Sequence, residues 1–142
     1  MKHDLKVEHE ILIHANAEEV WDTLINPEKI KQYLYGTHAK SEWTEGSPLT
    51  FSGEYEGEKY EDRGIIKVLK PNEVFQYTYW SGFSGLEDKP ENYSLITFEI
   101  QPTEDNVVLK LEQKGFVNED AQSHSDQGWR SMLQNIKEIA ES

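Results

Sequence analysis

The histidines are the side chains of this chain best suited to acid–base or metal chemistry. They stand at positions 3, 9, 14, 38 and 124. No two of them lie four positions apart, the spacing that places two metal ligands on one face of a helix. The chain also lacks cysteine, which excludes thiolate ligands and a thiol nucleophile. We therefore expect no metal and no other cofactor, although His9 and His124 occupy positions from which they could face a pocket.

Two other kinds of catalytic motif are missing. The sequence contains no Gly-x-Ser-x-Gly nucleophile elbow. Gly82 and Gly85 do not form a phosphate loop, because no strand-to-helix passage with a following lysine surrounds them. We assign no catalytic residue and favour a protein that is not an enzyme.

Asp62 is the one carboxylate whose position raises a question of chemistry. Strict strand alternation places it on the same face as Tyr60 and Ile66, where it would be a candidate acid or base. A one-residue bulge would instead turn Arg63 inward and Asp62 toward water. We favour the bulge, because charged side chains are rarely left buried.

Aromatic residues dominate the faces predicted to point inward. Tyrosines provide a flat apolar surface with one hydroxyl each, which suits a planar or lipid-like ligand, although the same rings could simply fill a core. A dry pocket of ~300 Å³ would cost ~7 kcal/mol, a large part of a total stability of about 5–15 kcal/mol. Any cavity is therefore small, or it is kept hydrated by tyrosine hydroxyls and Gln113. The inward set is Phe51, Tyr55, Tyr60, Phe75, Tyr77, Tyr79 and Phe98.

The sequence predicts one long helix, at the C-terminus, and the strands that carry these aromatic residues are expected to pack against it. Asn118 is a suitable N-cap for a helix reaching Ala140, and two acidic residues follow it. Large apolar side chains recur at helical spacing over the second half, whereas the first half of the same face carries small or polar residues. A sheet facing that first half would not be filled by the helix, which leaves room for a ligand. Alternatively, Gly128 only allows the helix and sheet to approach closely.

The rest of the chain is predicted to form strands, apart from two short helices. Residues 5–14 alternate as a first strand, and Asn16 and Pro27 mark the starts of two short helices. Alternating strands then run from Leu49 to Gln113, separated by turns at residues 56–58, 71–73 and 102–106. In the strand around residues 60–68, Val68 is predicted to share the inward face with Tyr60, Asp62, Gly64 and Ile66. The longest connection, residues 81–92, is rich in glycine, proline and charge and is placed near a pocket mouth.

Composition limits the partners. The chain has 142 residues, enough for one domain spanning 1–142, and a net charge of -13, which disfavours nucleic acids and anionic membranes. No signal-like or membrane-spanning stretch is visible, so a cytoplasmic protein is expected.

The order of elements resembles the helix-grip fold of the START, polyketide-cyclase and birch-allergen (SRPBCC) superfamily. Nearly the whole chain is similar to single-domain proteins related to the activator of the heat-shock protein Hsp90 ATPase. The resemblance implies an α+β fold in which a curved antiparallel sheet of about six to seven strands wraps around the C-terminal helix. Gln113 stands where many relatives carry histidine, which weakens any catalytic inference there. The similar stretches are residues 15–21, 64–68 with Pro71, 113–116, and Gly128-Trp129 with Leu133.

Our first hypothesis is a binding protein for a small hydrophobic or aromatic molecule held between the sheet and the long helix. The alternatives are a co-chaperone-like module that binds a protein partner and a cyclase-like or hydrolase-like enzyme. We expect the ligand site to be lined by Tyr33, Tyr60, Tyr77, Gln113, Ser125 and Gly128.

Overall fold

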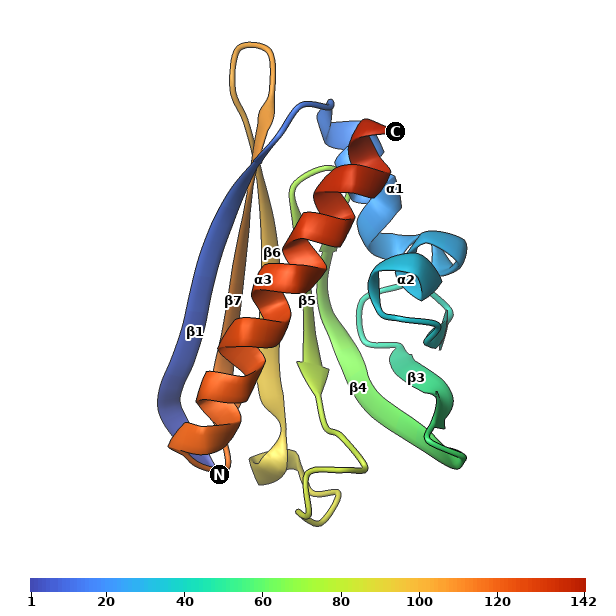
Figure 1. The fold of residues 1–142 in the computed structure, drawn as a ribbon, viewed down its shortest axis with the longest axis vertical. Coiled ribbons are helices and arrows are strands. Elements are labelled where there is room, and N and C mark those ends of the chain that lie inside the picture. Colours follow the sequence, from blue (N-terminus) through green and yellow to red (C-terminus); the bar gives the residue numbers. More distant parts are fainter.

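The computed structural model describes residues 1–142 as one curved sheet with three α-helices on its inner side (Figure 1). This is the α+β helix-grip architecture that the sequence predicts. The elements follow in the order β1 (Lys2–Ile13), α1 (Ala17–Ile25), α2 (Pro27–Tyr33), β2 (His38–Ser41), β3 (Pro48–Tyr55), β4 (Glu58–Lys70), β5 (Val74–Tyr79), the short 3-10 helix η1 (Pro90–Asn92), β6 (Ser94–Pro102), β7 (Val107–Phe116) and α3 (Glu119–Glu141).

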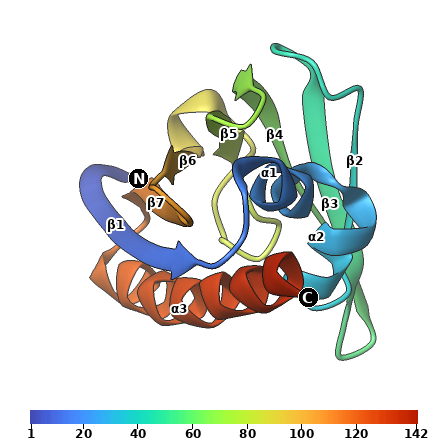
Figure 2. The ribbon, with the colours of Figure 1, turned by 90° about the horizontal axis from the view of Figure 1, so that it is seen from above.

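The seven strands form a single antiparallel sheet in the order β1-β7-β6-β5-β4-β3-β2. β1 therefore leaves its sequence neighbours and pairs with β7, while the other strands form a meander. Figure 2 shows how the sheet curves, with α3, α1 and α2 on its concave side. β2 is an edge strand that the sequence pattern did not reveal, because four residues are too few for a clear alternation.

Asparagine side chains start all three α-helices. Asn16 accepts a hydrogen bond from the Glu19 amide at 2.8 Å, and Asn26 accepts one from the Glu28 amide at 3.0 Å. Asn118 accepts one from the Ala121 amide at 2.9 Å, which confirms the predicted start of α3. Each cap satisfies a backbone N–H that has no partner within its helix.

Two predictions about which residues of β4 point inward, those for Asp62 and Val68, are wrong. Alternation continues without a bulge through Asp62, which is 8% exposed, so the outward orientation that we favoured for this residue is wrong. The register shift lies further along, between Ile66 and Val68. Leu69 consequently packs against the core opposite Phe75, and the inward placement of Val68 is also wrong.

The packed core lies under the C-terminal half of α3. Trp129, Leu133, Ile136 and Ala140 are buried there, as the helical spacing predicts. In the first half of α3, the small side chains of Ala121 and Ser125 face the space under the sheet, and neither is fully buried. None of the helices combines the length and apolar character needed to span a membrane.

Candidate functional site

A cleft of about 1090 Å³ opens where the first half of α3 faces the sheet. Its inner wall consists of strands β3 to β7, and its rim is formed by the loop after α2, the β3–β4 hairpin and the loop after β5. More than half of the lining residues are hydrophobic. The cleft exists because small side chains on α3 do not fill the space that the curved sheet encloses.

Aromatic rings form one wall of the cleft. The ring of Phe51 lies 5.7 Å from that of Tyr77 and 6.0 Å from that of Tyr79, measured between centroids. Phe75 packs behind Tyr77 at 4.9 Å and belongs to the core rather than to the lining. These rings from β3 and β5 meet across β4, whose inward residues at this level are Asp62 and Gly64, and they form one aromatic surface.

The hydroxyl of Tyr77 is the polar group of this wall that lacks a partner. The residue is 5% exposed, yet its hydroxyl makes no hydrogen bond within the protein. No fully buried side-chain polar atom lacks a partner, so this hydroxyl must retain access to the space of the cleft. Burial raises the pKa of Tyr77, which keeps the hydroxyl protonated and able to donate.

Gln113 connects β7 to the helix through its side-chain amide. Its Oε1 accepts hydrogen bonds from Trp129 Nε1 at 2.7 Å and from Ser125 Oγ at 3.0 Å. Its Nε2 donates to Ser94 Oγ at 3.1 Å. These bonds fix the width of the cleft where the wall meets α3.

Asp62 brings a carboxylate to the aromatic wall. Its Oδ2 accepts a hydrogen bond from the Tyr79 hydroxyl at 2.5 Å, and its Oδ1 accepts one from the Gly82 amide at 3.1 Å. Burial is the main cause of the raised pKa of Tyr79, and the charge of Asp62 adds to it. Asp62 thereby joins β4 to the beginning of the loop that borders the cleft.

Tyr60 lies nearer the mouth and is held by the loop after α2. Its hydroxyl shares a 2.6 Å hydrogen bond with Thr37 Oγ1. Gly53, opposite Tyr60 in the β3–β4 pair, leaves room for this ring, because a Cβ at this position would lie 2.5 Å from the Tyr60 hydroxyl oxygen. Phe83 covers the ring of Tyr60 at a centroid distance of 5.6 Å.

Exposed aromatic side chains surround the mouth. Tyr35, Tyr55 and Phe83 all line the cleft, and each is more than half exposed to solvent. Tyr55 was predicted to point into the core, but the β3–β4 hairpin extends past the body of the sheet and leaves it at the rim. Exposed rings around an apolar opening provide further contact area for a bound molecule.

The structure brings four of the six predicted site residues to the cleft and leaves two elsewhere. Tyr60, Tyr77, Gln113 and Ser125 line it. Tyr33 instead lies between the short helices, where its hydroxyl donates to the Leu24 carbonyl at 2.9 Å. Gly128 lies outside the lining as well, because it is one position before Trp129, which occupies the inward face of α3.

The two histidines considered from the sequence are separated. His124 lines the cleft near its mouth, whereas His9 does not. His9 Nε2 lies 2.7 Å from Asp126 Oδ1 and joins β1 to α3. No group of three or more His, Asp or Glu side chains is arranged to hold a metal ion.

Sequence reasoning omitted several lining residues from the site. Asp62 and Tyr79 carried a usable signal, since unbroken alternation places both on the inward face. Thr37 and Phe83 had no such signal, because both belong to loops whose course depends on the rest of the fold.

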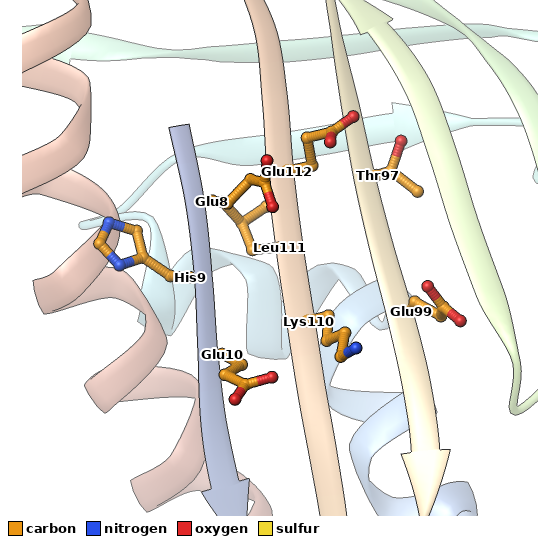
Figure 3. A pocket seen from close by; sticks show the side chains of 8 residues that line it. All are labelled: Glu8, His9, Glu10, Thr97, Glu99, Lys110, Leu111 and Glu112. Atoms are coloured by element: carbon orange, nitrogen blue, oxygen red, sulfur yellow. The ribbon is translucent and has the colours of Figure 1, made fainter. Parts of the chain in front are cut away.

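A second, smaller depression of about 400 Å³ lies on the outer face of the sheet. Figure 3 shows Glu8 and Glu10 of β1, Lys110 and Glu112 of β7, and Glu99 of β6 around it. His9 points away from this face, toward α3. The depression is polar, with four carboxylates around one lysine, and resembles a solvated sheet face rather than a ligand pocket.

Solved structures share this architecture. The solution structure of ChR145 from Cytophaga hutchinsonii is 36% identical and matches with a TM-score of 0.84, covering 99% of this chain and 97% of that one. The solution structure of the Aha1 dimer from Colwellia psychrerythraea is 17% identical, with a TM-score of 0.75 and 96% of both chains covered. CalU16 from Micromonospora echinospora is 18% identical, with a TM-score of 0.74, covering 95% of this chain and 75% of that one.

The family comparison covers most of the sequence. No curated protein matches the chain. Residues 14–141 match the model of the family described as activator of Hsp90 ATPase homolog 1-like protein. Because this match extends over nearly the whole chain, from the end of β1 to the end of α3, the protein belongs to the family of activator of Hsp90 ATPase homolog 1-like proteins.

Proposed function

We propose that this protein binds a small hydrophobic or aromatic molecule in the cleft between the sheet and the first half of α3, without a cofactor. The observation that carries the proposal is the Tyr77 hydroxyl, which is almost fully buried in an aromatic wall and has no partner in the protein. The hydroxyl opens onto the cleft, so its only partner in the free protein is water. A ligand with a hydrogen-bond acceptor would satisfy the hydroxyl.

The size of the cleft also supports ligand binding. As a dry void costing ~24 cal/mol per Å³, its volume of about 1090 Å³ would cost ~26 kcal/mol, more than a domain of this size can lose. The open cleft is therefore filled by water until a ligand enters. Displacing poorly ordered water from aromatic walls favours the binding of apolar molecules. The volume lies slightly above the usual ~300–1,000 Å³ of small-molecule sites, as expected for a cleft that is open to solvent.

The test is a titration of the isotope-labelled protein with fatty acids, sterols and planar aromatic compounds, followed by backbone-amide NMR. We expect one class to shift resonances of residues 60–62, 77–82, 113–116 and 121–132, which border the cleft. An unchanged spectrum with every class would contradict the proposal. Shifts confined to the outer face around Glu99 and Lys110 would contradict the location of the site.

A pair of α3 variants separates cleft binding from surface binding. Ala121→Phe places a ring in the cleft, because Ala121 lines it in the first turn of α3. Gln127→Phe adds the same ring on an exposed position of the same helix. We expect at least a tenfold loss of affinity for the first variant only. Equal affinities for both variants would exclude a site next to Ala121.

A co-chaperone-like role is the second candidate, and the acidic outer face favours it. Glu8, Glu10, Glu99 and Glu112 surround Lys110 there (Figure 3). Such a face would bind a basic protein surface in a salt-dependent manner. The test is the ATPase rate of Hsp90 with added protein, compared with a Glu99→Gln/Glu112→Gln variant. A salt-sensitive stimulation that the variant reduces would support this role, and no stimulation would contradict it.

A further inference from the structure

The charged side chains that line the cleft are acidic, while its basic groups are His124 and the α-amino group of Met1. No lysine or arginine side chain is among the 30 residues that line it. Glu54, Glu56 and Glu58 carry carboxylates at its rim, and Asp62 carries one within its aromatic wall. A bound carboxylate, phosphate or sulfate would find no lysine or arginine side chain, only His124 and the Met1 amine, and would meet four carboxylates.

Asp62 has no counter-ion within the protein. The basic residue nearest in sequence, Arg63, alternates to the opposite face, where it pairs with Asp88 at 3.2 Å and lies over the ring of Trp80 at 5.7 Å. No basic side chain lies within 4.0 Å of Asp62, whose two hydrogen bonds come from a hydroxyl and an amide. A buried carboxylate without a cation is costly unless a partner is supplied.

A purely structural role accounts for only part of this arrangement. Asp62 does join β4 to the loop after β5, through Tyr79 and Gly82. A neutral asparagine could accept one of these bonds without placing a charge among Phe51, Tyr77 and Tyr79. Each carboxylate oxygen has two lone-pair sites and accepts one bond here, so further acceptor sites remain.

The lining contains two further features that suit a cation. The faces of aromatic rings attract ammonium groups, and the rings of Phe51 and Tyr79 stand next to Asp62 on the same face of the sheet. The unpartnered Tyr77 hydroxyl offers an acceptor as well as a donor. Together they form a partly desolvated, electron-rich site that is open to the solvent on one side.

We infer that the cleft selects a hydrophobic amine, whose ammonium group hydrogen-bonds to Asp62 while its apolar part lies along the aromatic wall. The inference rests on the ligand-binding function proposed above and specifies the class of ligand. Neutral analogues bind more weakly, and hydrophobic anions are rejected.

Three fluorescent probes with one ring system test this selectivity: 1-pyrenemethylamine, 1-pyrenemethanol and 1-pyrenecarboxylate. Binding is followed by energy transfer from the tryptophans, two of which, Trp80 and Trp129, line the cleft. We expect the amine to bind about tenfold or more tightly than the alcohol, the gain of a charged hydrogen bond, and the carboxylate to bind most weakly. An equal or tighter affinity for the carboxylate overturns the inference but leaves the proposed function intact. If no probe binds, the proposed function fails and the inference with it.

Matched variants separate a specific charge pair from the general attraction of an acidic protein. Asp62→Asn should reduce the preference for the amine over the alcohol to less than about threefold. Glu99→Gln removes one charge from the outer face and should leave the preference unchanged. An equal effect of both variants would assign the preference to the net charge of -13 and overturn the inference. If Asp62→Asn does not fold, the ammonium preference is measured in the unmodified protein at rising salt, and its disappearance at 0.5 M would overturn the inference.

Discussion

The side-chain oxygen of Gln113 lies 2.7 Å from the indole nitrogen of Trp129, so strand β7 and helix α3 share a buried hydrogen bond beside the cleft. Ser125 donates to the same oxygen from one turn earlier in the helix. This position sets how far α3 stands from the sheet, and therefore how wide the cleft is at that end.

Replacing Gln113 by leucine should destabilise the protein by about 1–3 kcal/mol, because Trp129 Nε1 would lose its buried acceptor. Urea unfolding followed by tryptophan fluorescence measures the change. Gln101→Leu, on the outer face of β6, is the control and should alter the free energy of unfolding by less than ~0.5 kcal/mol. Equal effects of both variants would show that the Gln113 bond contributes nothing specific.

Replacing Tyr77 by phenylalanine should weaken ligand binding without weakening the fold. The hydroxyl makes no hydrogen bond in the protein, so we expect the free energy of unfolding to change by less than ~0.5 kcal/mol. A ligand that accepts its hydrogen bond should lose about two- to tenfold in affinity. Calorimetric titration together with urea unfolding measures both quantities. A clear loss of stability would mean that the hydroxyl has a structural partner after all.

At alkaline pH, the buried tyrosines should ionise at a higher pH than the exposed ones. Burial raises the pKa of Tyr33 and Tyr77, and burial together with Asp62 raises that of Tyr79. The pKa values of these three tyrosines are higher in the folded than in the unfolded protein. The contribution of the three protonated hydroxyls to the free energy of unfolding is therefore complete below about pH 10 and is lost as the pH rises above it.

Absorbance at 295 nm checks this expectation. The folded protein should reach only part of the absorbance change expected for its seven tyrosines until it unfolds. The same protein in urea is the control and should titrate completely near pH 10. Tyr93, whose pKa burial and Asp88 raise to about 12, should also titrate late. Complete ionisation of the folded protein near pH 10 would contradict the buried positions of Tyr33, Tyr77 and Tyr79.

Two glycine-to-alanine substitutions should have opposite effects. Gly128→Ala should stabilise the protein by about 0.5–1 kcal/mol, because alanine is the better helix former and its Cβ would meet only the Met132 methyl group at 3.8 Å. Gly64→Ala should destabilise it severely, since a Cβ there would lie 1.6 Å from the Thr78 carbonyl oxygen. The melting temperatures of the two variants, compared with that of the unmodified protein, measure both effects. Similar melting temperatures would contradict the close approach of β4 and β5 at Gly64.

The sequence by itself determined the helices and all strands except β2, because their signals are local. Asn118 and the repeat from Trp129 to Ala140 define α3, and the change from large to small side chains along its inward face indicated where space would be left. Alternation likewise placed Tyr60 and Tyr77 on the inner face of the sheet, where both line the cleft.

Only the tertiary structure decided which of these residues meet. Tyr33 has the same residue type as Tyr77, but the docking of α2 on α1 directs its hydroxyl to the Leu24 carbonyl. We expected Asp62 to face water because charged side chains are rarely buried. The Tyr79 hydroxyl and the Gly82 amide that donate to its carboxylate come from another strand and a loop, so the sequence around Asp62 gave no sign of them. Such partners are distant in sequence and come together only when the sheet curves around α3, so no local pattern could reveal them.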